Sequence, residues 1–127
     1  MPHFIVECSE NILKMKTADE IMCAVYNAAG ATGLFAENDI KVRLNSYAYW
    51  KLGYGKGSFL HVFGNIMAGR TTEQKADLSR QVVSAICALL PDLSFVSMNI
   101  SEFELETYCN KALIHPMNTQ NDRHFDL

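Results

Sequence analysis

Long apolar runs, basic clusters and one-sided charge are all missing from this sequence of 127 residues. No stretch approaches the roughly 18 apolar residues that a membrane-spanning helix needs. The first four residues, MPHF, lack the basic and apolar segments of a signal peptide. Lys and Arg number 11 against 14 Asp and Glu, giving a net charge of −3 with no block of like charge. We therefore expect a cytoplasmic protein with no nucleic-acid or membrane partner.

Cysteine and histidine occur without the spacings that bind metals. The four cysteines stand singly, with no Cys-x-x-Cys pair, and the four histidines form no ligand-spaced cluster with them. Both patterns disfavour a zinc site, and single cysteines in a cytoplasmic protein are expected to stay reduced. At 49% hydrophobic and 20% charged residues, the chain is expected to form one domain over residues 1–127.

Two similar strand–helix–strand units are predicted along the chain. In the first, residues 3–8 favour a strand, and Thr17 with Glu20 forms a capping box for a helix. Gly30 and Gly33 are expected to end that helix, whose apolar face consists of Ile21, Ala24, Val25 and Ala28. A half-buried strand follows, in which Ile40, Val42 and Leu44 alternate with Lys41, Arg43 and Asn45.

The second unit repeats this order. Residues 59–67 favour a strand, and Thr71 with Gln74 forms a second capping box. Pro91 is expected to stop the second helix, whose apolar face consists of Leu78, Val82, Ile86 and Leu89. Residues 95–103 favour the last strand.

Together the two units predict an α+β fold. Val6 of the first unit corresponds to Val62 of the second, and each helical crossover is long enough to make its two strands parallel. The expected result is a four-stranded mixed sheet with both helices on one face. The other face stays uncovered unless another subunit covers it, which favours an oligomer. For residues 111–127, with their weak periodicity, both disorder and an arm that packs on a neighbour remain open.

Pro2 is the first candidate catalytic residue, because removal of Met1 exposes its secondary amine. Initiator methionine is usually trimmed in bacteria when the next residue is small, as proline is. An α-amino group has an ordinary pKa of about 7.7–8.0, and partial burial beside cations lowers it further. Such an amine serves as a general base or as a nucleophile. The alternative is a proline at position 2 without a function.

Three cations are candidate anion-binding residues. Lys41 and Arg43 lie two positions apart in a strand and so project from one face of the sheet. They either bind a carboxylate, for which arginine offers a bidentate fork, or only make that face soluble. Arg70 lies between a strand and the first turn of a helix, where backbone N–H groups favour anions. A plain surface position is the alternative for Arg70.

The glycine-rich run from Gly53 to Gly57 resembles a phosphate-binding loop only superficially. A dinucleotide-binding loop joins a strand to a helix, whereas this run joins two predicted strands. We therefore expect a hairpin connection. The neighbouring aromatic residues Tyr47, Tyr49 and Trp50 line a pocket or an interface, or they simply cover the sheet.

Two segments resemble known enzymes. The first nine residues, MPHFIVECS, closely resemble the start of 5-carboxymethyl-2-hydroxymuconate Δ-isomerases. Residues 69–75, GRTTEQK, are similar to the strand-to-helix motif of 4-oxalocrotonate tautomerase. Both families belong to the tautomerase superfamily, and the resemblance covers nearly the whole chain. It implies a tautomerase-like fold assembled as a homotrimer, active sites at the subunit interfaces, and no metal or organic cofactor.

The resemblance also implies a reaction. Isomerases of this kind convert a polycarboxylate 2-hydroxydienoate from homoprotocatechuate (4-hydroxyphenylacetate) degradation into its 2-oxo-3-enoate isomer, and Pro2 is implied as the general base. Arg70 matches the arginine that holds a substrate carboxylate in the Gly-Arg-Ser/Thr motif, and Arg43 matches a strand arginine of the isomerases. Lys41 departs from their Arg-x-Arg pair. Lysine keeps the charge but lacks the fork, so substrate affinity or preference is expected to differ.

Two other functions remain open on the sequence. Another tautomerase-superfamily enzyme, such as a phenylpyruvate-type ketonase or a dehalogenating hydratase, would keep Pro2 and use the cations for a different acid. A non-enzymatic trimeric binding protein would keep the fold, with Pro2 incidental. Retention of Met1 would turn the Pro2 nitrogen into an amide, so the isomerase hypothesis requires removal of Met1.

Overall fold

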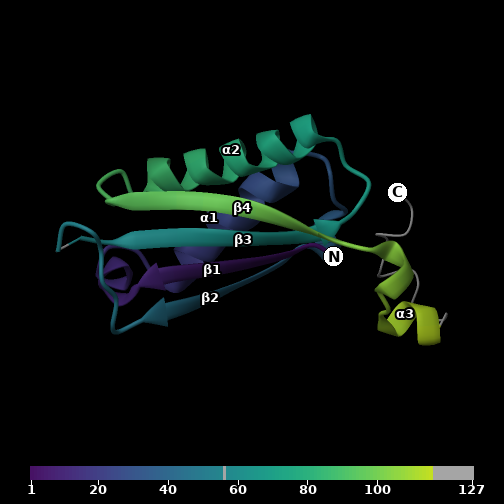
Figure 1. The fold of residues 1–127 in the computed structure, drawn as a ribbon, viewed down its shortest axis with the longest axis horizontal. Coiled ribbons are helices and arrows are strands. Elements are labelled where there is room, and N and C mark those ends of the chain that lie inside the picture. Colours follow the sequence, from purple (N-terminus) through teal and green to yellow (C-terminus); the bar gives the residue numbers. More distant parts are fainter. Residues whose placement is uncertain (56, 116–127) are drawn as a thin grey trace.

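Four strands and two long helices form the body of the protein in a computed structural model, which describes residues 1–55 and 57–115 (Figure 1). The elements are β1 (His3–Ser9), α1 (Ala18–Ala31), β2 (Lys41–Tyr47), β3 (Phe59–Met67), α2 (Thr72–Leu89), β4 (Phe95–Phe103) and α3 (Lys111–Ile114). Short 3-10 helices occupy Glu10–Lys14, Glu37–Asp39 and Leu105–Thr107.

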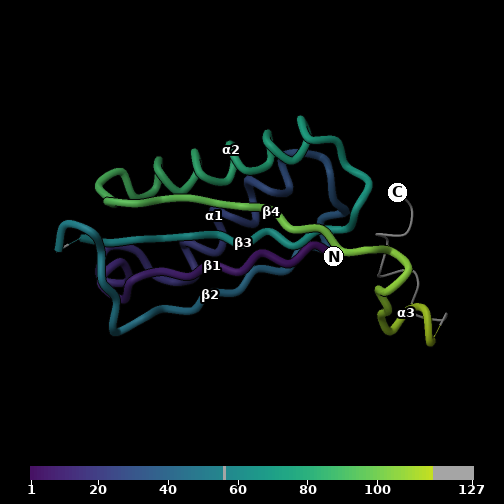
Figure 2. Tube along the Cα trace, viewed as in Figure 1, coloured from purple at the N-terminus to yellow at the C-terminus, as the bar shows by residue number. Residues whose placement is uncertain are grey.

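The strands lie in the order β2-β1-β3-β4, as the trace in Figure 2 also shows. Strands β1 and β2 are parallel, β3 and β4 are parallel, and the central pair β1–β3 is antiparallel. Each parallel pair is joined by one long helix, as expected for a helical crossover. The predicted α+β fold and its mixed four-stranded sheet are confirmed.

Both long helices begin at the predicted capping boxes. At the start of α1, Thr17 Oγ1 accepts the Glu20 N–H at 3.1 Å, and the Glu20 carboxylate accepts the Thr17 N–H at 3.1 Å. Thr71 and Gln74 make the same reciprocal pair at the start of α2, at 3.1 and 2.9 Å. Each box satisfies two N–H groups that the helix itself leaves without partners.

The helix ends agree with the sequence only in part. Helix α2 stops at Leu89, two residues before Pro91, as predicted. For α1, the expectation that Gly30 ends the helix is wrong, because the helix runs through Gly30 to Ala31. A single glycine costs a helix only about 1 kcal/mol, which tertiary packing readily offsets. The chain reverses instead at Gly33, whose φ of +74° suits glycine.

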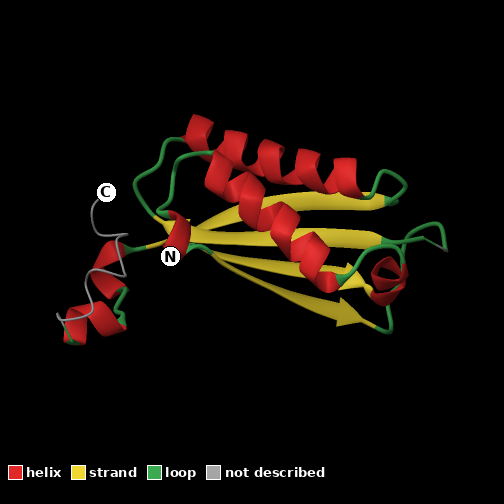
Figure 3. Cartoon of the chain, turned by 180° about the vertical axis from the view of Figure 1, so that it is seen from behind, coloured by secondary structure: helices red, strands yellow, loops and turns green. Residues whose placement is uncertain are grey.

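The core fills the space between the sheet and the two helices, which cross the same face of the sheet (Figure 3). Its fully buried side chains come from α1 (Ile21, Val25, Ala29), α2 (Leu78, Val82, Ile86), β1 (Phe4, Val6, Cys8) and β3 (Val62, Ile66). Burial raises the pKa of the Cys8 thiol to about 11, so this side chain packs as a small neutral group. The predicted helix faces are therefore the ones that pack on the sheet.

The opposite side of the sheet, called the open face below, carries no helix in the described part of the chain (Figure 1). Large apolar side chains stay partly exposed there, with Phe63 at 36% and Phe95 at 52%. The sequence predicts such an uncovered face from the placement of both helices. As for membranes, none of the described helices has both the length and the apolar character that crossing a bilayer requires.

Beyond β4 the chain leaves the sheet. Helix α3 projects past the end of the sheet at which the chain begins (Figure 1). Its Leu113 and Ile114 side chains are 51% and 66% exposed, while Tyr108 packs on Phe103 with ring centroids 6.3 Å apart. The segment 111–127, for which the sequence left both disorder and a packing arm open, begins with the short helix α3. Residues 116–127 of this segment lie outside the described residues.

Candidate active site

Three segments come together at one end of the sheet: the start of β1, the start of β2 and the end of β3. His3 pairs with Lys41 of the parallel strand and with Asn65 of the antiparallel strand. The Lys41 N–H also donates to the Pro2 carbonyl at 3.1 Å. Arg70 lies three residues beyond the end of β3. The topology therefore brings Pro2, Lys41 and Arg70 to the same end of the sheet (Figure 1).

Pro2 is buried and held by backbone pairing at the entry to β1. Met1 is only 4% exposed, so it is buried against the protein rather than extending into solvent. The peptide bond from Met1 makes the Pro2 nitrogen an amide, which is not basic. In the chain that carries Met1, Pro2 is therefore held in place, but its nitrogen cannot act as a base.

Lys41 and Arg43 both lie on the open face, as their spacing predicts. Lys41 is in register with His3, and Arg43 is in register with Ile5. The Lys41 ammonium donates to the Asp39 carbonyl at 2.7 Å, which directs it toward the start of β2. Both side chains are exposed, so their charges are available to an anion.

Arg70 is more firmly held than the other two cations. Its Nη2 donates to the Leu34 carbonyl at 2.6 Å, and its guanidinium carbon lies 4.9 Å from the centre of the Phe35 ring. Phe35 in turn packs edge-to-face on Phe4, with centroids 6.0 Å apart. Partial burial lowers the pKa of Arg70, although a guanidinium stays charged. The loop after α1 therefore fixes where this charge sits, a contact that the sequence does not reveal.

His3 is a site residue that the sequence reasoning missed. Its Nδ1 lies 3.0 Å from Nη1 of Arg43 on the open face. Burial lowers the pKa of His3, and the positive charges of Arg43, the chain terminus and Lys41 lower it further. The signal was available in the sequence, since the strand alternation that aligns Lys41 with Arg43 also places His3 and Ile5 on one face.

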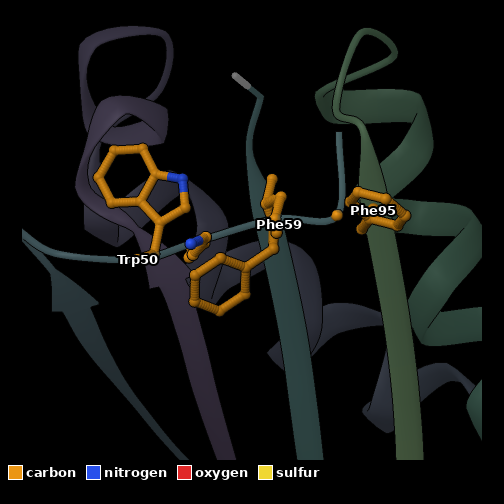
Figure 4. A pocket seen from close by; sticks show the side chains of 6 residues that line it. Trp50, Phe59 and Phe95 are labelled. Atoms are coloured by element: carbon orange, nitrogen blue, oxygen red, sulfur yellow. The ribbon is translucent and has the colours of Figure 1, made fainter. Parts of the chain in front are cut away.

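An aromatic hollow lies at the opposite end of the sheet. It measures about 450 Å³ and is lined by Trp50, Lys51, Leu52, Gly53, Phe59 and Phe95. Figure 4 shows the rings of Trp50, Phe59 and Phe95 around it. Of the aromatic residues left open by the sequence, Trp50 lines this hollow, Tyr47 packs on Phe59, and Tyr49 is 93% exposed. The run 53–57 joins β2 to β3, as predicted, but the expectation of a hairpin is wrong, because β1 lies between these two strands in the sheet and they do not pair.

Sequence comparison decides the family. The family model described as 5-carboxymethyl-2-hydroxymuconate isomerase matches residues 2–117, nearly the whole chain. The chain belongs to this isomerase family. A curated relative, the 5-carboxymethyl-2-hydroxymuconate Delta-isomerase of Escherichia coli, is 29% identical over 108 residues, covering 84% of this chain and 86% of its own.

Solved structures place this isomerase-family chain in the tautomerase fold. A 5-carboxymethyl-2-hydroxymuconate isomerase from Deinococcus radiodurans R1 superposes with a TM-score of 0.74 at 20% identity, covering 87% of this chain and 88% of that one. A fused 4-OT described as a symmetric trimer gives a TM-score of 0.70 at 18% identity, covering 86% and 91%. At such low identities the likeness establishes the fold, and membership of the enzyme family rests on the sequence match.

The site has the parts for carboxylate chemistry. Three cations and His3 surround the start of β1; Arg70 donates to the Leu34 carbonyl, and Nη1 of Arg43 lies within hydrogen-bond distance of Nδ1 of His3. Arginine binds planar carboxylates through paired hydrogen bonds, and cations placed where negative charge develops stabilise an enolate. While Met1 is attached, the Pro2 nitrogen is an amide and cannot serve as the base.

Proposed function

We propose that this protein isomerises 5-carboxymethyl-2-hydroxymuconate after Met1 has been removed. The amine of Pro2 acts as the general base: it takes the proton of the 2-hydroxyl group, and a proton is delivered to C5. The product is the 2-oxo-3-ene isomer. The observation that carries this proposal is the placement of Pro2 at the cationic end of the sheet in a chain of this isomerase family.

Pro2 suits the role of base for a physical reason. The ordinary pKa of an α-amino group, about 7.7–8.0, is already near neutrality. Burial and nearby positive charge both favour the neutral amine, and Pro2 is buried beside the cationic start of β2. A base with a pKa near the working pH transfers protons most efficiently.

The cations would hold the carboxylates of the substrate. We assign carboxylate binding to Arg70, Arg43 and Lys41, and we expect the negative charge of the dienolate to be stabilised by them. Conjugation in the substrate delocalises the charge, so the reaction needs no metal or organic cofactor. Lys41, which stands where the isomerases carry arginine, offers a point charge without a fork.

The assembly and setting follow from the same reasoning. We propose one domain over residues 1–127, assembled as a homotrimer, acting in the cytoplasm on a small polycarboxylate of aromatic-compound catabolism. Trimerisation would cover the apolar side chains of the open face, such as Phe63 and Phe95. In the trimer, a neighbouring subunit would complete each active site.

The test is an ultraviolet assay on chain that intact mass confirms to start at Pro2. Three substrates are compared at equal concentration: 5-carboxymethyl-2-hydroxymuconate, 2-hydroxymuconate and phenylpyruvate. We expect the highest kcat/KM for the first. Preference for either of the others would indicate another tautomerase-superfamily enzyme, and no turnover of any would indicate a trimeric binding protein.

A further inference from the structure

We propose that His3 is a positioning residue, which holds the Arg43 guanidinium in place for a substrate carboxylate by acting as a neutral hydrogen-bond acceptor. The carboxylate substrate in this inference comes from the proposed function, whereas the His3–Arg43 pair is independent of it. On this proposal, Arg43 is oriented by His3, the residue that follows Pro2 in the chain.

The geometry fixes which partner donates. Nη1 of Arg43 lies 3.0 Å from Nδ1 of His3. A guanidinium only donates and stays protonated at any ordinary pH, so Nδ1 must be the acceptor and carry no proton. The His3 ring is therefore neutral, with its proton on Nε2. The guanidinium keeps its remaining N–H groups for a carboxylate.

The surroundings of His3 favour this neutral form. From β2, it faces Lys41 and Arg43; from β3, its partner in register is the uncharged Asn65; from its own strand, the chain terminus adds positive charge. The charges that act on the ring are thus all positive, and the ring is partly buried. Burial and these charges lower the pKa of His3, so the acceptor remains available at neutral pH.

Backbone pairing makes the arrangement rigid. Strands β1 and β2 are in parallel register from His3–Lys41 to Ser9–Tyr47, so the Cα positions of His3 and Arg43 are fixed by the sheet. A long arginine side chain otherwise samples many rotamers and loses that freedom on binding. A partner that holds Arg43 before the substrate arrives reduces this cost, which predicts an effect on KM rather than on kcat.

The experiment compares two substitutions at one position. His3→Ala removes the acceptor, whereas His3→Asn places an amide oxygen near the position of Nδ1. On chain trimmed to Pro2, checked by intact mass, we expect His3→Ala to raise KM about tenfold with kcat within about twofold. His3→Asn should restore KM to within about threefold of the parent. His115→Asn, on the exposed segment after β4, is the matched control and should change neither parameter.

A second measurement needs no turnover. Ring ¹⁵N chemical shifts should show Nδ1 of His3 unprotonated at pH 7, and Arg43→Gln should raise the pKa of His3, because it removes a neighbouring cation. Binding of cis,cis-muconate, which lacks the reacting hydroxyl group, should weaken in His3→Ala and recover in His3→Asn.

These results separate the two proposals. A proton on Nδ1, an unchanged His3 pKa in Arg43→Gln, or equal effects of His3→Ala and His3→Asn would overturn the positioning role. Absence of turnover in the parent chain, with the ring tautomer and the muconate pattern as expected, would overturn only the proposed reaction.

Discussion

The two ends of the sheet have the same arrangement of strands but carry different kinds of side chain. Strands β1 and β2 begin at one end, and the corresponding strands β3 and β4 begin at the other, because β1 and β3 are antiparallel. The first register pair is His3–Lys41 at one end and Phe59–Phe95 at the other. The end of the sheet at which β1 and β2 begin thus carries polar and cationic side chains, whereas the end at which β3 and β4 begin carries the aromatic hollow.

This difference agrees with the proposed function, in which the repeat provides the scaffold and the Pro2 amine provides the base. Each unit contributes a capped helix and a parallel strand pair, but Pro2 precedes the first strand of the first unit and Ser58 precedes that of the second. Ser58, which precedes β3, is an internal residue, and its N–H donates to Ser94 Oγ at 3.2 Å. Under the proposed function, the basic amine of Pro2 therefore lies at only one of the two ends.

Retention of Met1 tests this asymmetry most strongly. Chain prepared with Met1 and chain trimmed to Pro2 share every side chain of the site, but only in the trimmed form is the Pro2 nitrogen basic. Loss of a general base typically costs about 10²–10⁴-fold in rate, and we expect that loss in kcat/KM for the form with Met1. Intact mass must show each preparation to be pure. Equal turnover by the two forms would refute the role of Pro2.

The scaffold should respond equally in both units. Ile21 and Leu78 are the first fully buried residues of α1 and α2. Substitution of either by alanine leaves a cavity, which we expect to cost about 2–5 kcal/mol of unfolding free energy. Urea unfolding at one fixed protein concentration gives the measurement, since oligomers gain stability with concentration. A cost below about 1 kcal/mol for only one of the two would show that the units are not equivalent.

Arg70 tests the cationic end directly. Arg70→Ala removes a charged donor, worth about 1.5–3 kcal/mol, so we expect kcat/KM to fall by about 10- to 100-fold with the hydroxymuconate substrate. A small loss of stability should accompany it, because the bond to the Leu34 carbonyl and the contact with Phe35 are lost.

Arg80→Ala is the matched control for Arg70, since the Arg80 side chain is 71% exposed and lies 4.0 Å from Asp77. Surface ion pairs of this kind contribute little, so kinetics and stability should stay unchanged. If Arg70→Ala behaved like Arg80→Ala in the kinetic assay, Arg70 would not belong to the site.

The smallest expected effect concerns the capping boxes. Thr17→Ala and Thr71→Ala each remove the hydroxyl group that accepts a backbone N–H at 3.1 Å. We expect each to cost about 1 kcal/mol of unfolding free energy, with Thr→Ser at the same positions close to the parent. Thermal or urea unfolding of the four variants provides the comparison. A serine variant as unstable as the alanine variant would argue that the methyl group, not the cap, matters.

Much of the scaffold was predictable because it depends on local rules. Strands β3 and β4 have the predicted bounds, and both helices start at the predicted threonines. The error at Gly30 arose because intrinsic helix propensity is weak beside tertiary packing. Contacts between distant segments were beyond such rules: the bond from Arg70 to Leu34 joins residues 36 positions apart, and the bond from Arg43 to His3 joins residues 40 apart.

The sequence by itself determined the strand–helix–strand repeat, the shared face of Lys41 and Arg43, and the likeness to the isomerase family. These follow from side-chain periodicity, capping chemistry and motif identity, which act over a few residues. Only the tertiary structure decided that Arg70 is fixed by the loop after α1 and that His3 holds Arg43. Those contacts depend on strand order and register, which arise when the whole sheet packs against its two helices.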